Sequence, residues 1–172
     1  MQRGLTIFLT GLPAAGKTTI AHGLADWFER ESRPVTLLDG DVVRQDLSAE
    51  LGFSKEHRDL NIRRIGFVAA EITRHGGTCI CSPIAPYEAA RKAVRTMVER
   101  FGRFLLVYVS TPVEVCESRD PKGLYAKARA GLISCVTGVT DPYEVPTDAD
   151  IVIDTSVIST REAVKAVLQK AL

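Results

Sequence analysis

Apolar residues along the chain gather in short runs, rich in β-branched residues, that end at glycine, proline or acidic residues. One such run, LTIFLT, lies between Gly4 and Gly11. Short apolar runs with turn residues at their ends indicate buried strands. The pattern predicts five strands, at residues 5–10, 33–39, 77–82, 104–110 and 151–155.

The segments between these runs carry their apolar residues at helical spacing. Ile20, Leu24, Trp27 and Phe28 show this clearly, because residues three and four apart share one face of a helix. Helices are predicted over residues 17–31, 41–52, 58–75, 87–101 and 159–171, the last with Ser159 or Thr160 at its start, and another helix is predicted to begin with Thr111 as its cap.

The alternation of strands and helices predicts an α/β fold in three layers, a mainly parallel sheet covered by helices on both faces. The length of 172 residues fits a single domain over residues 1–172. The pattern fails between Arg119 and Pro146, where glycine, proline and charged residues interrupt short apolar pieces. We expect a long mobile loop there, with a helical turn or two.

Composition and charge exclude several classes of protein. The net charge of +1 provides no basic field for nucleic acid, and no apolar run reaches the roughly 18 residues that span a membrane. The apolar start of the chain runs straight into a glycine-rich loop, which cleavage as a signal peptide would destroy. The four cysteines, at positions 79, 81, 116 and 135, lack the CxxC spacing of metal sites, so we expect reduced thiols in a cytoplasmic protein.

Residues 11–19, GLPAAGKTT, fit the phosphate-binding P-loop pattern in full, with a predicted strand before them and a helix after. The glycines allow backbone N–H groups to turn inward around phosphate oxygens, and the start of the helix adds favourable partial charge. Lys17 is expected to reach the β- and γ-phosphates and the Thr18 hydroxyl to ligate Mg²⁺. The predicted nucleotide-binding residues are Gly11, Ala15, Gly16, Lys17, Thr18 and Thr19.

Two carboxylates follow the second predicted strand in the run Asp39-Gly40-Asp41. Such a pair can serve Mg²⁺ and can hold an acceptor hydroxyl for attack. Asp41 also suits the N-cap of the helix predicted over residues 41–52. We therefore expect Asp39 to be the principal functional carboxylate and Asp41 to combine both roles.

Anion-binding and stacking residues come next along the chain. Arg58 and Asn61 lie three residues apart on one predicted helical face, and with Arg44 they can surround an anionic group. Phe53 lies outside any apolar periodicity and is either a stacking platform for a base or an ordinary core residue. The chain has no NKxD guanine-binding element, and its late charged loop suits a kinase that closes a lid over a small acceptor.

With these motifs, the chain resembles the adenylyl-sulfate kinase family, whose members phosphorylate the 3′-hydroxyl of adenosine 5′-phosphosulfate with ATP. The resemblance covers nearly the whole chain. It also extends, more loosely, to the kinase region fused to ATP sulfurylase in some bacteria. The motifs that carry it are GLPAAGKTT, LDGDVVR (38–44), GFSKEHRDLNIRR (52–64), SPIAPY (82–87), DPKGLYAKARAG (120–131) and TGVTDPYEVP (137–146).

The resemblance implies a P-loop kinase fold with a lid over about residues 119–146, Mg²⁺ held with ATP by Thr18 and Asp39, and a homodimer. It implies that Phe53 stacks on the adenine and that Lys122 bridges phosphate charge between the two substrates. Catalytic roles fall on Lys17, Asp39, Asp41 and Lys122. The implied substrate-binding residues are Asp41, Arg44, Phe53, Arg58, Asn61, Ser82, Ile84, Lys122, Gly123, Leu124 and Val136, with Ser82 either a substrate contact or a strand-end cap.

Two positions depart from the pattern of the family. Ala85 stands where many members have a serine described as a phosphorylated intermediate, so transfer here must be direct. Val136 stands where the family often has a second phenylalanine that sandwiches the adenine, which predicts weaker binding of adenosine phosphosulfate.

Two other functions are open. Another small-molecule P-loop kinase, for a sugar or nucleoside, would not need the arginines and the stacking ring. A catalytically silent nucleotide-binding module attached to ATP sulfurylase would not need Lys17, Thr18, Asp39, Asp41 and Lys122 intact.

Overall fold

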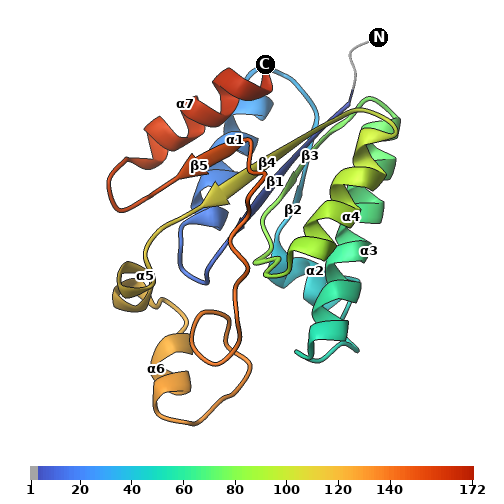
Figure 1. Cartoon of the computed structure of the whole chain (residues 1–172). Helices are drawn as coiled ribbons and strands as arrows, with labels where there is room; N and C mark the ends of the chain where they lie inside the picture. Colours follow the sequence, from blue (N-terminus) through green and yellow to red (C-terminus); the bar gives the residue numbers. More distant parts are fainter. Residues whose placement is uncertain (1–3) are drawn as a thin grey trace.

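The computed structural model describes residues 4–172 (Figure 1); residues 1–3, which begin the segment considered above as a signal peptide, lie outside the described part. All five predicted strands are present. They form one parallel sheet in the order β2-β3-β1-β4-β5. Their bounds are β1 (Leu5–Gly11), β2 (Val35–Leu38), β3 (Thr78–Cys81), β4 (Arg103–Val109) and β5 (Ile151–Ile153).

Helices cover both faces of this sheet, as the alternation predicts. α1 and α7 pack together on one face, and α3 and α4 pack together on the other (Figure 1). The helices in the described part of the chain are α1 (Lys17–Arg30), α2 (Gly40–Asp46), α3 (Lys55–Arg74), α4 (Glu88–Glu99), α5 (Val113–Arg119), α6 (Leu124–Arg129) and α7 (Thr160–Ala171). The three-layer α/β architecture is therefore confirmed.

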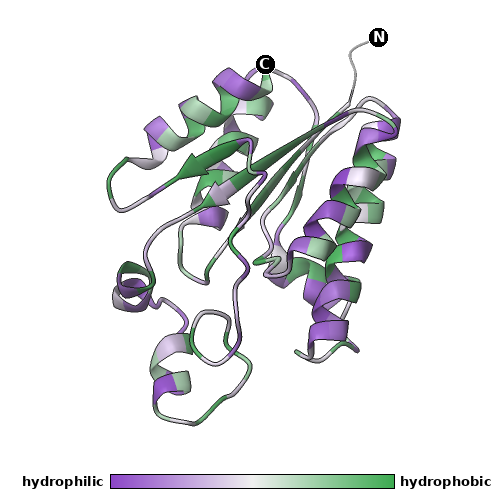
Figure 2. Ribbon diagram, in the orientation of Figure 1, coloured by the Kyte–Doolittle hydropathy of each residue, from purple (hydrophilic) through white to green (hydrophobic). Residues whose placement is uncertain are grey.

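The central strand β1 joins the two halves of the core. Its side chains alternate between the faces: Ile7 and Leu9 pack in the cluster formed with α1 and α7, and Phe8 packs in the cluster formed with α3 and α4. Figure 2 shows this as apolar strands between helices whose outward residues are largely polar. A strand that is buried along its whole length holds the loop that follows it in a fixed place.

The helix after β2 differs from the prediction. It begins at Gly40, because the Asp39 side chain caps it by accepting a hydrogen bond from the Asp41 N–H over 3.0 Å. It also ends at Asp46 rather than at residue 52. The expectation that Asp41 is the N-cap is therefore wrong, and Asp39 has that role.

The starts of two other helices also differ. α3 begins at Lys55 rather than at residue 58, because the Ser54 hydroxyl accepts a hydrogen bond from the His57 N–H. Thr111 does not cap α5, which begins after Pro112; the Thr111 hydroxyl bonds elsewhere. Ser159, by contrast, caps α7 as expected, in a reciprocal arrangement with Glu162.

The 119–146 segment runs beyond the carboxyl ends of the strands (Figure 1) and contains α6, in agreement with the expected helical turn. Near its end the Glu144 N–H donates to the Pro86 carbonyl just before α4, and the chain then continues to β5. All four cysteines are free thiols, and the Sγ atoms of Cys79 and Cys81 lie 3.7 Å apart on β3. Within residues 4–172, none of the helices combines the length and the apolar character needed to cross a bilayer.

Candidate active site

A cavity of about 1010 Å³ lies at the carboxyl ends of the strands, where ligands bind in open parallel sheets. The chain that follows each of the five strands contributes to its wall. The structure brings together there most of the predicted residues: Gly16, Lys17, Thr18, Thr19, Asp39, Asp41, Arg44, Phe53, Arg58, Asn61, Ser82, Ile84, Lys122 and Leu124, with Ala85. Gly11, Ala15, Gly123 and Val136 are not among the lining residues.

The loop between β1 and α1 needs its two glycines for steric reasons. Gly16 has φ +104°, in a region that residues with a side chain rarely adopt. At Gly11 an added Cβ would lie only 2.4 Å from the Val109 carbonyl oxygen of the adjacent strand. The loop therefore keeps a tight path that leads directly into the N-terminus of α1, which is a favourable place for a phosphate.

Side chains from later strand ends hold the outer carbonyl groups of this loop. The Ala15 carbonyl accepts hydrogen bonds from the hydroxyls of Thr111 (2.9 Å) and Thr155 (2.8 Å). The Tyr125 hydroxyl donates to the Pro13 carbonyl over 2.9 Å, and Arg119 donates to the backbone and hydroxyl oxygens of Thr155. Carbonyl groups that are fixed on the outside leave the N–H groups of the loop to a bound anion.

These four bracing residues were missed by the sequence analysis. Thr111 lies two residues after the end of β4 and Thr155 two residues after the end of β5, so their position at the carboxyl edge of the sheet was an available signal. Tyr125 belongs to the DPKGLY motif, but nothing in that motif indicates that its hydroxyl reaches the P-loop. Arg119 had no signal beyond its place at the start of the irregular segment.

Lys17 is buried at the base of the cavity. Its ammonium group donates to the carbonyl oxygens of Gly11 (2.9 Å) and Leu12 (2.7 Å). Burial lowers the pKa of Lys17 to about 8, although nearby Cys116 and the Asp39 and Asp41 carboxylates act in the opposite direction. A bound polyphosphate would favour the charged form of this amine again.

Asp39 connects the nucleotide loop with the loop after β3. One of its oxygens, Oδ2, accepts hydrogen bonds from both the Thr18 hydroxyl and the Ser82 hydroxyl, each over 3.1 Å. Partial burial acts to raise the pKa of Asp39, but hydrogen bonds from the Asp41 N–H and these hydroxyls outweigh it and hold the pKa below its usual value. The group is therefore an anion at neutral pH.

The pair formed by Thr18 and Asp39 offers a hydroxyl and a carboxylate oxygen side by side. Hard oxygen ligands of this kind suit Mg²⁺, which takes one or two protein ligands and completes its coordination with phosphates and water. The donor set therefore fits a nucleotide-bound Mg²⁺ ion.

Lys122 forms an ion pair with Asp41. Lys122 lies in the turn before α6 and Asp41 in the first turn of α2, so the pair connects the 119–146 segment with the end of β2. Both side chains are exposed, which makes the pair weak and easy to exchange for another anion.

Phe53 is not a core residue, since 57% of its surface is exposed. Its ring faces arginines: the guanidinium carbons of Arg44 and Arg58 lie 4.5 and 5.9 Å from the ring centroid. An exposed aromatic ring that lines a cavity is available for stacking, and cation–π contacts keep it in place. Stacking on a base stays a prediction.

Arg58 and Asn61 play different parts on the face of α3 that they share. Arg58 is buried and donates to the Phe53 carbonyl (2.8 Å), the Cys135 carbonyl, the Thr137 hydroxyl (2.7 Å) and the Asp141 carboxylate (3.1 Å). It therefore anchors the 119–146 segment to α3. Asn61 is buried beside it, and its Oδ1 has no hydrogen-bond partner within the described residues. An unpaired buried acceptor in the wall of a cavity is suited to a ligand donor.

The two residues at the departing positions have different surroundings. Ala85 is buried in the cavity wall, in a left-handed backbone conformation with φ +48°. Val136 is buried in a turn of the 119–146 segment, where its carbonyl oxygen accepts hydrogen bonds from the N–H groups of Val139, Thr140 and Asp141. Contact between Val136 and an adenine ring stays a prediction.

A five-stranded parallel sheet with a phosphate-binding loop after its central strand, and two carboxylates after the next strand of the chain, is typical of the P-loop kinase fold. The family model for adenylylsulphate kinase matches residues 3–154. The chain therefore belongs to the adenylylsulphate kinase family.

Individual relatives agree with this membership. An adenylyl-sulfate kinase from Synechococcus sp. (strain JA-3-3Ab) is 51% identical over 168 residues, which are 98% of this chain and 94% of that protein. The Mycobacterium tuberculosis APS kinase CysC, solved in complex with AMPPNP and APS, superposes with a TM-score of 0.94 at 35% identity and 98% coverage of both chains. A sulfate adenylyltransferase from Phaeosphaeria nodorum is 50% identical over 97% of this chain, which spans only 29% of that longer protein.

Proposed function

We propose that this protein transfers the γ-phosphoryl group of ATP to the 3′-hydroxyl of adenosine 5′-phosphosulfate, giving 3′-phosphoadenosine 5′-phosphosulfate and ADP. The observation that carries the proposal is the position of Asp39. Its carboxylate bonds to Thr18 of the nucleotide loop and to Ser82 of the loop after β3, so one cavity has a donor side and an acceptor side that meet at an anionic group. A nucleotide kinase needs this arrangement, because phosphoryl transfer depends mainly on positioning and electrostatics.

On the donor side, the N–H groups between Gly11 and Gly16 would surround the phosphates of ATP, and Lys17 would contact the β- and γ-phosphates. Mg²⁺, held with ATP by the Thr18 hydroxyl and the Asp39 carboxylate, would neutralise charge on the β- and γ-phosphates. Lys17 exchanges its two carbonyl partners for phosphate oxygens and stabilises the negative charge that develops on them.

On the acceptor side, Phe53 stacks on the adenine of adenosine phosphosulfate and Asn61 Oδ1 accepts a hydrogen bond from it. The unpaired Asn61 oxygen and the exposed Phe53 ring support these roles. Arg44 supplies positive charge to the phosphosulfate. Asp41, at the start of α2, orients the 3′-hydroxyl, and either Asp41 or Asp39 accepts its proton.

The transfer is direct and in line. Ala85 has no oxygen that can carry phosphate, and the loop that contains it lines the cavity as a wall. A phosphoenzyme at this position is therefore impossible, and incubation with γ-labelled ATP alone should leave the protein unlabelled. A stable label on the protein would contradict direct transfer without affecting the assignment of the overall reaction.

The 119–146 segment acts as a lid over the two substrates. In this structure Lys122 pairs with Asp41; with both substrates bound, Lys122 contacts phosphate charge between them, and Gly123, Leu124 and Val136 approach the acceptor. A closed lid excludes water, which would otherwise compete with the ribose hydroxyl for the phosphoryl group.

A coupled assay of ADP release tests the proposed reaction. Purified protein should release ADP rapidly with adenosine phosphosulfate and only slowly with water, gluconate or nucleosides as acceptors. Release with another acceptor but not with adenosine phosphosulfate would contradict the proposal. Binding of adenosine phosphosulfate without ADP release would favour a catalytically silent module.

We also propose a cytoplasmic homodimer that works alone or beside an ATP sulfurylase. Four free thiols and the membership of the family support this setting. Light scattering during size-exclusion chromatography, with and without a sulfurylase, measures the mass of the assembly.

A further inference from the structure

A positive charge is buried beside the acceptor loop, which comprises residues 82–86. Arg91, in the first turn of α4, is only 2% exposed and is the bulkiest fully buried side chain of the described residues. Glu88, Glu144 and Asp148 lie close enough to favour its charge, but none of them forms a direct ion pair with it in residues 4–172, and its Nε has no hydrogen-bond partner there. Burying a charge that lacks a direct ion pair is costly, so the hydrogen bonds that this group does form are the main reason to consider a role beyond packing.

The guanidinium group of Arg91 holds two chain segments that reach the active site from different directions. Nη1 donates to the Ala85 carbonyl of the acceptor loop over 2.7 Å, and Nη2 donates to the Glu144 carbonyl at the end of the 119–146 segment, also over 2.7 Å. The planar fork of a guanidinium can satisfy two such carbonyls at once, which a lysine ammonium cannot do with the same geometry.

The end of β1, directly before the P-loop, is bonded to the same acceptor loop. Thr10, the residue before Gly11, donates its hydroxyl to the carbonyls of Ile84 (2.6 Å) and Ala85 (3.2 Å). Its oxygen shares a 2.9 Å hydrogen bond with the Tyr143 hydroxyl, and the Arg91 guanidinium lies 5.8 Å from the centroid of the Tyr143 ring. Three segments are thus joined around Arg91: the end of β1, the acceptor loop and the last residues of the 119–146 segment.

Two further hydrogen bonds fix the end of the 119–146 segment to the end of the acceptor loop and the start of α4. The Glu144 N–H donates to the Pro86 carbonyl over 2.8 Å, and the Glu144 carboxylate accepts from the Glu88 N–H over 2.6 Å. Ala85, directly before Pro86, has a left-handed backbone conformation, which costs energy and must be held by the contacts around it. Arg91 and Thr10 therefore fix the position of the acceptor loop relative to the P-loop.

We propose that Arg91 is a positioning residue for phosphoryl transfer: it fixes the acceptor loop, and with it the second substrate, against the P-loop. The proposal rests on the kinase function proposed above. Arg91 touches neither substrate. It acts through the Ala85 and Glu144 carbonyls, whose displacement by a fraction of an ångström moves the acceptor hydroxyl away from in-line geometry.

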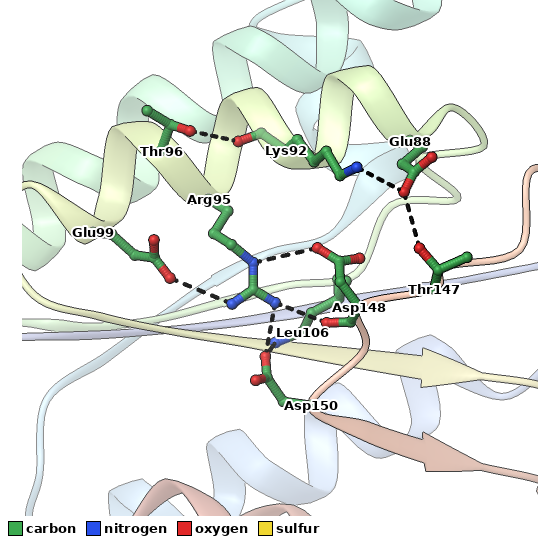
Figure 3. A network of polar contacts seen from close by, with 9 residues as sticks. All are labelled: Glu88, Lys92, Arg95, Thr96, Glu99, Leu106, Thr147, Asp148 and Asp150. Carbon is green, nitrogen blue, oxygen red and sulfur yellow. Dashed lines mark hydrogen bonds and ion pairs between the residues drawn. The ribbon is translucent and has the colours of Figure 1, made fainter.

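Arg95 provides a matched control on the same helix. It lies one turn further along α4 and also holds the returning chain, through the Asp148 carbonyl (3.1 Å) and the Asp150 carboxylate (2.9 Å), as Figure 3 shows. Its network includes Glu99 but no residue of the acceptor loop. Loss of Arg95 therefore removes a comparable anchor between α4 and the chain before β5 and leaves the cavity wall intact.

The test compares Arg91→Met, Arg91→Lys and Arg95→Met by steady-state kinetics with each substrate varied, together with thermal unfolding. We expect Arg91→Met to lower kcat/KM for adenosine phosphosulfate by about 100-fold and to change the KM for ATP less than about twofold. Arg91→Lys, which keeps the charge and one carbonyl contact, should recover about tenfold of this loss. Arg95→Met should lower the melting temperature and leave both kcat/KM values unchanged.

The isosteric change Thr10→Val keeps the test decisive if Arg91→Met does not fold. It removes the hydroxyl that holds the Ile84 and Ala85 carbonyls of the acceptor loop and should reproduce the loss for adenosine phosphosulfate with little change in the KM for ATP. A large rise in the KM for ATP, or lower stability with unchanged kinetics in the Arg91 variants, would overturn the proposed role. An inactive wild-type protein would instead refute the kinase function on which the role depends.

Discussion

The Thr18 hydroxyl donates a hydrogen bond to Asp39 Oδ2 over 3.1 Å, which joins the first turn of α1 to the N-cap of α2. Asp39 therefore has two functions that a single substitution can separate. One of its oxygens, Oδ1, accepts a hydrogen bond from the Asp41 N–H and caps α2. The other, Oδ2, faces the nucleotide loop and brings negative charge to it.

Asp39→Asn should lower kcat strongly and leave the fold intact. An asparagine oxygen still accepts the hydrogen bond from the Asp41 N–H, so the cap of α2 is retained. The loss of negative charge beside Thr18 weakens the grip on the nucleotide and removes a proton acceptor, which we expect to cost about 100-fold in kcat. Steady-state assays and circular dichroism measure the two effects.

Asp46→Asn is the matched control, because Asp46 is an exposed residue at the other end of α2 and does not line the cavity. Its kinetics should equal those of the wild type. If Asp39→Asn were as active as Asp46→Asn, Asp39 would be a helix cap without a part in the reaction.

The sequence determines the architecture well because each strand and long helix has a local pattern that agrees with the global fold. The P-loop was predicted residue by residue, since a strand, a glycine loop and a helix follow one another without interruption. The predictions that were wrong concern contacts that depend on the order of the strands in the sheet. Thr111 has a suitable sequence for a helix cap, but β4 lies next to β1, so its hydroxyl reaches the Ala15 carbonyl instead.

Arg58 shows the same limit on the acceptor side. Its helical face follows from spacing, but three of its four partners are Cys135, Thr137 and Asp141. These three lie about 80 positions away, in a segment with no periodic pattern. No rule based on local sequence gives the path of that segment. The division of work between Arg58, as an anchor, and Asn61, as a free acceptor, could therefore be found only in three dimensions.

Phe53→Ala should raise the KM for adenosine phosphosulfate by about 5- to 150-fold, since stacking on a base contributes about 1–3 kcal/mol. The KM for ATP should not change, and neither should the stability, because the ring is mostly exposed. Phe67→Ala is the control: Phe67 is 63% exposed on α3 and does not line the cavity. A Phe53→Ala enzyme with an unchanged KM for the acceptor would exclude stacking on this ring.

Lys122→Ala should lower kcat by about 100- to 1000-fold with little change in melting temperature. An exposed ion pair such as Lys122 with Asp41 contributes little to folding, whereas a charge that contacts the transferred group stabilises the transition state. Lys127→Ala, at an exposed position on α6 away from the cavity wall, should behave like the wild type in the same assays. Equal activity of the two variants would show that the lid needs no charge at position 122.

The lowered pKa of Lys17 predicts a pH dependence of ATP binding. Burial brings this pKa to about 8 in the free protein, and only the protonated amine attracts phosphate. As pH rises through about 8, the protonated fraction falls, so kcat/KM for ATP should fall with a limiting slope of tenfold per pH unit. Phosphate oxygens titrate near pH 6, so measurements between pH 7.5 and 9.5 report the protein and not the nucleotide. Lys17→Arg, which stays charged over this range, should give a lower but flat profile; a wild-type profile that is flat to pH 9.5 would show that Lys17 keeps its ordinary pKa in the free protein.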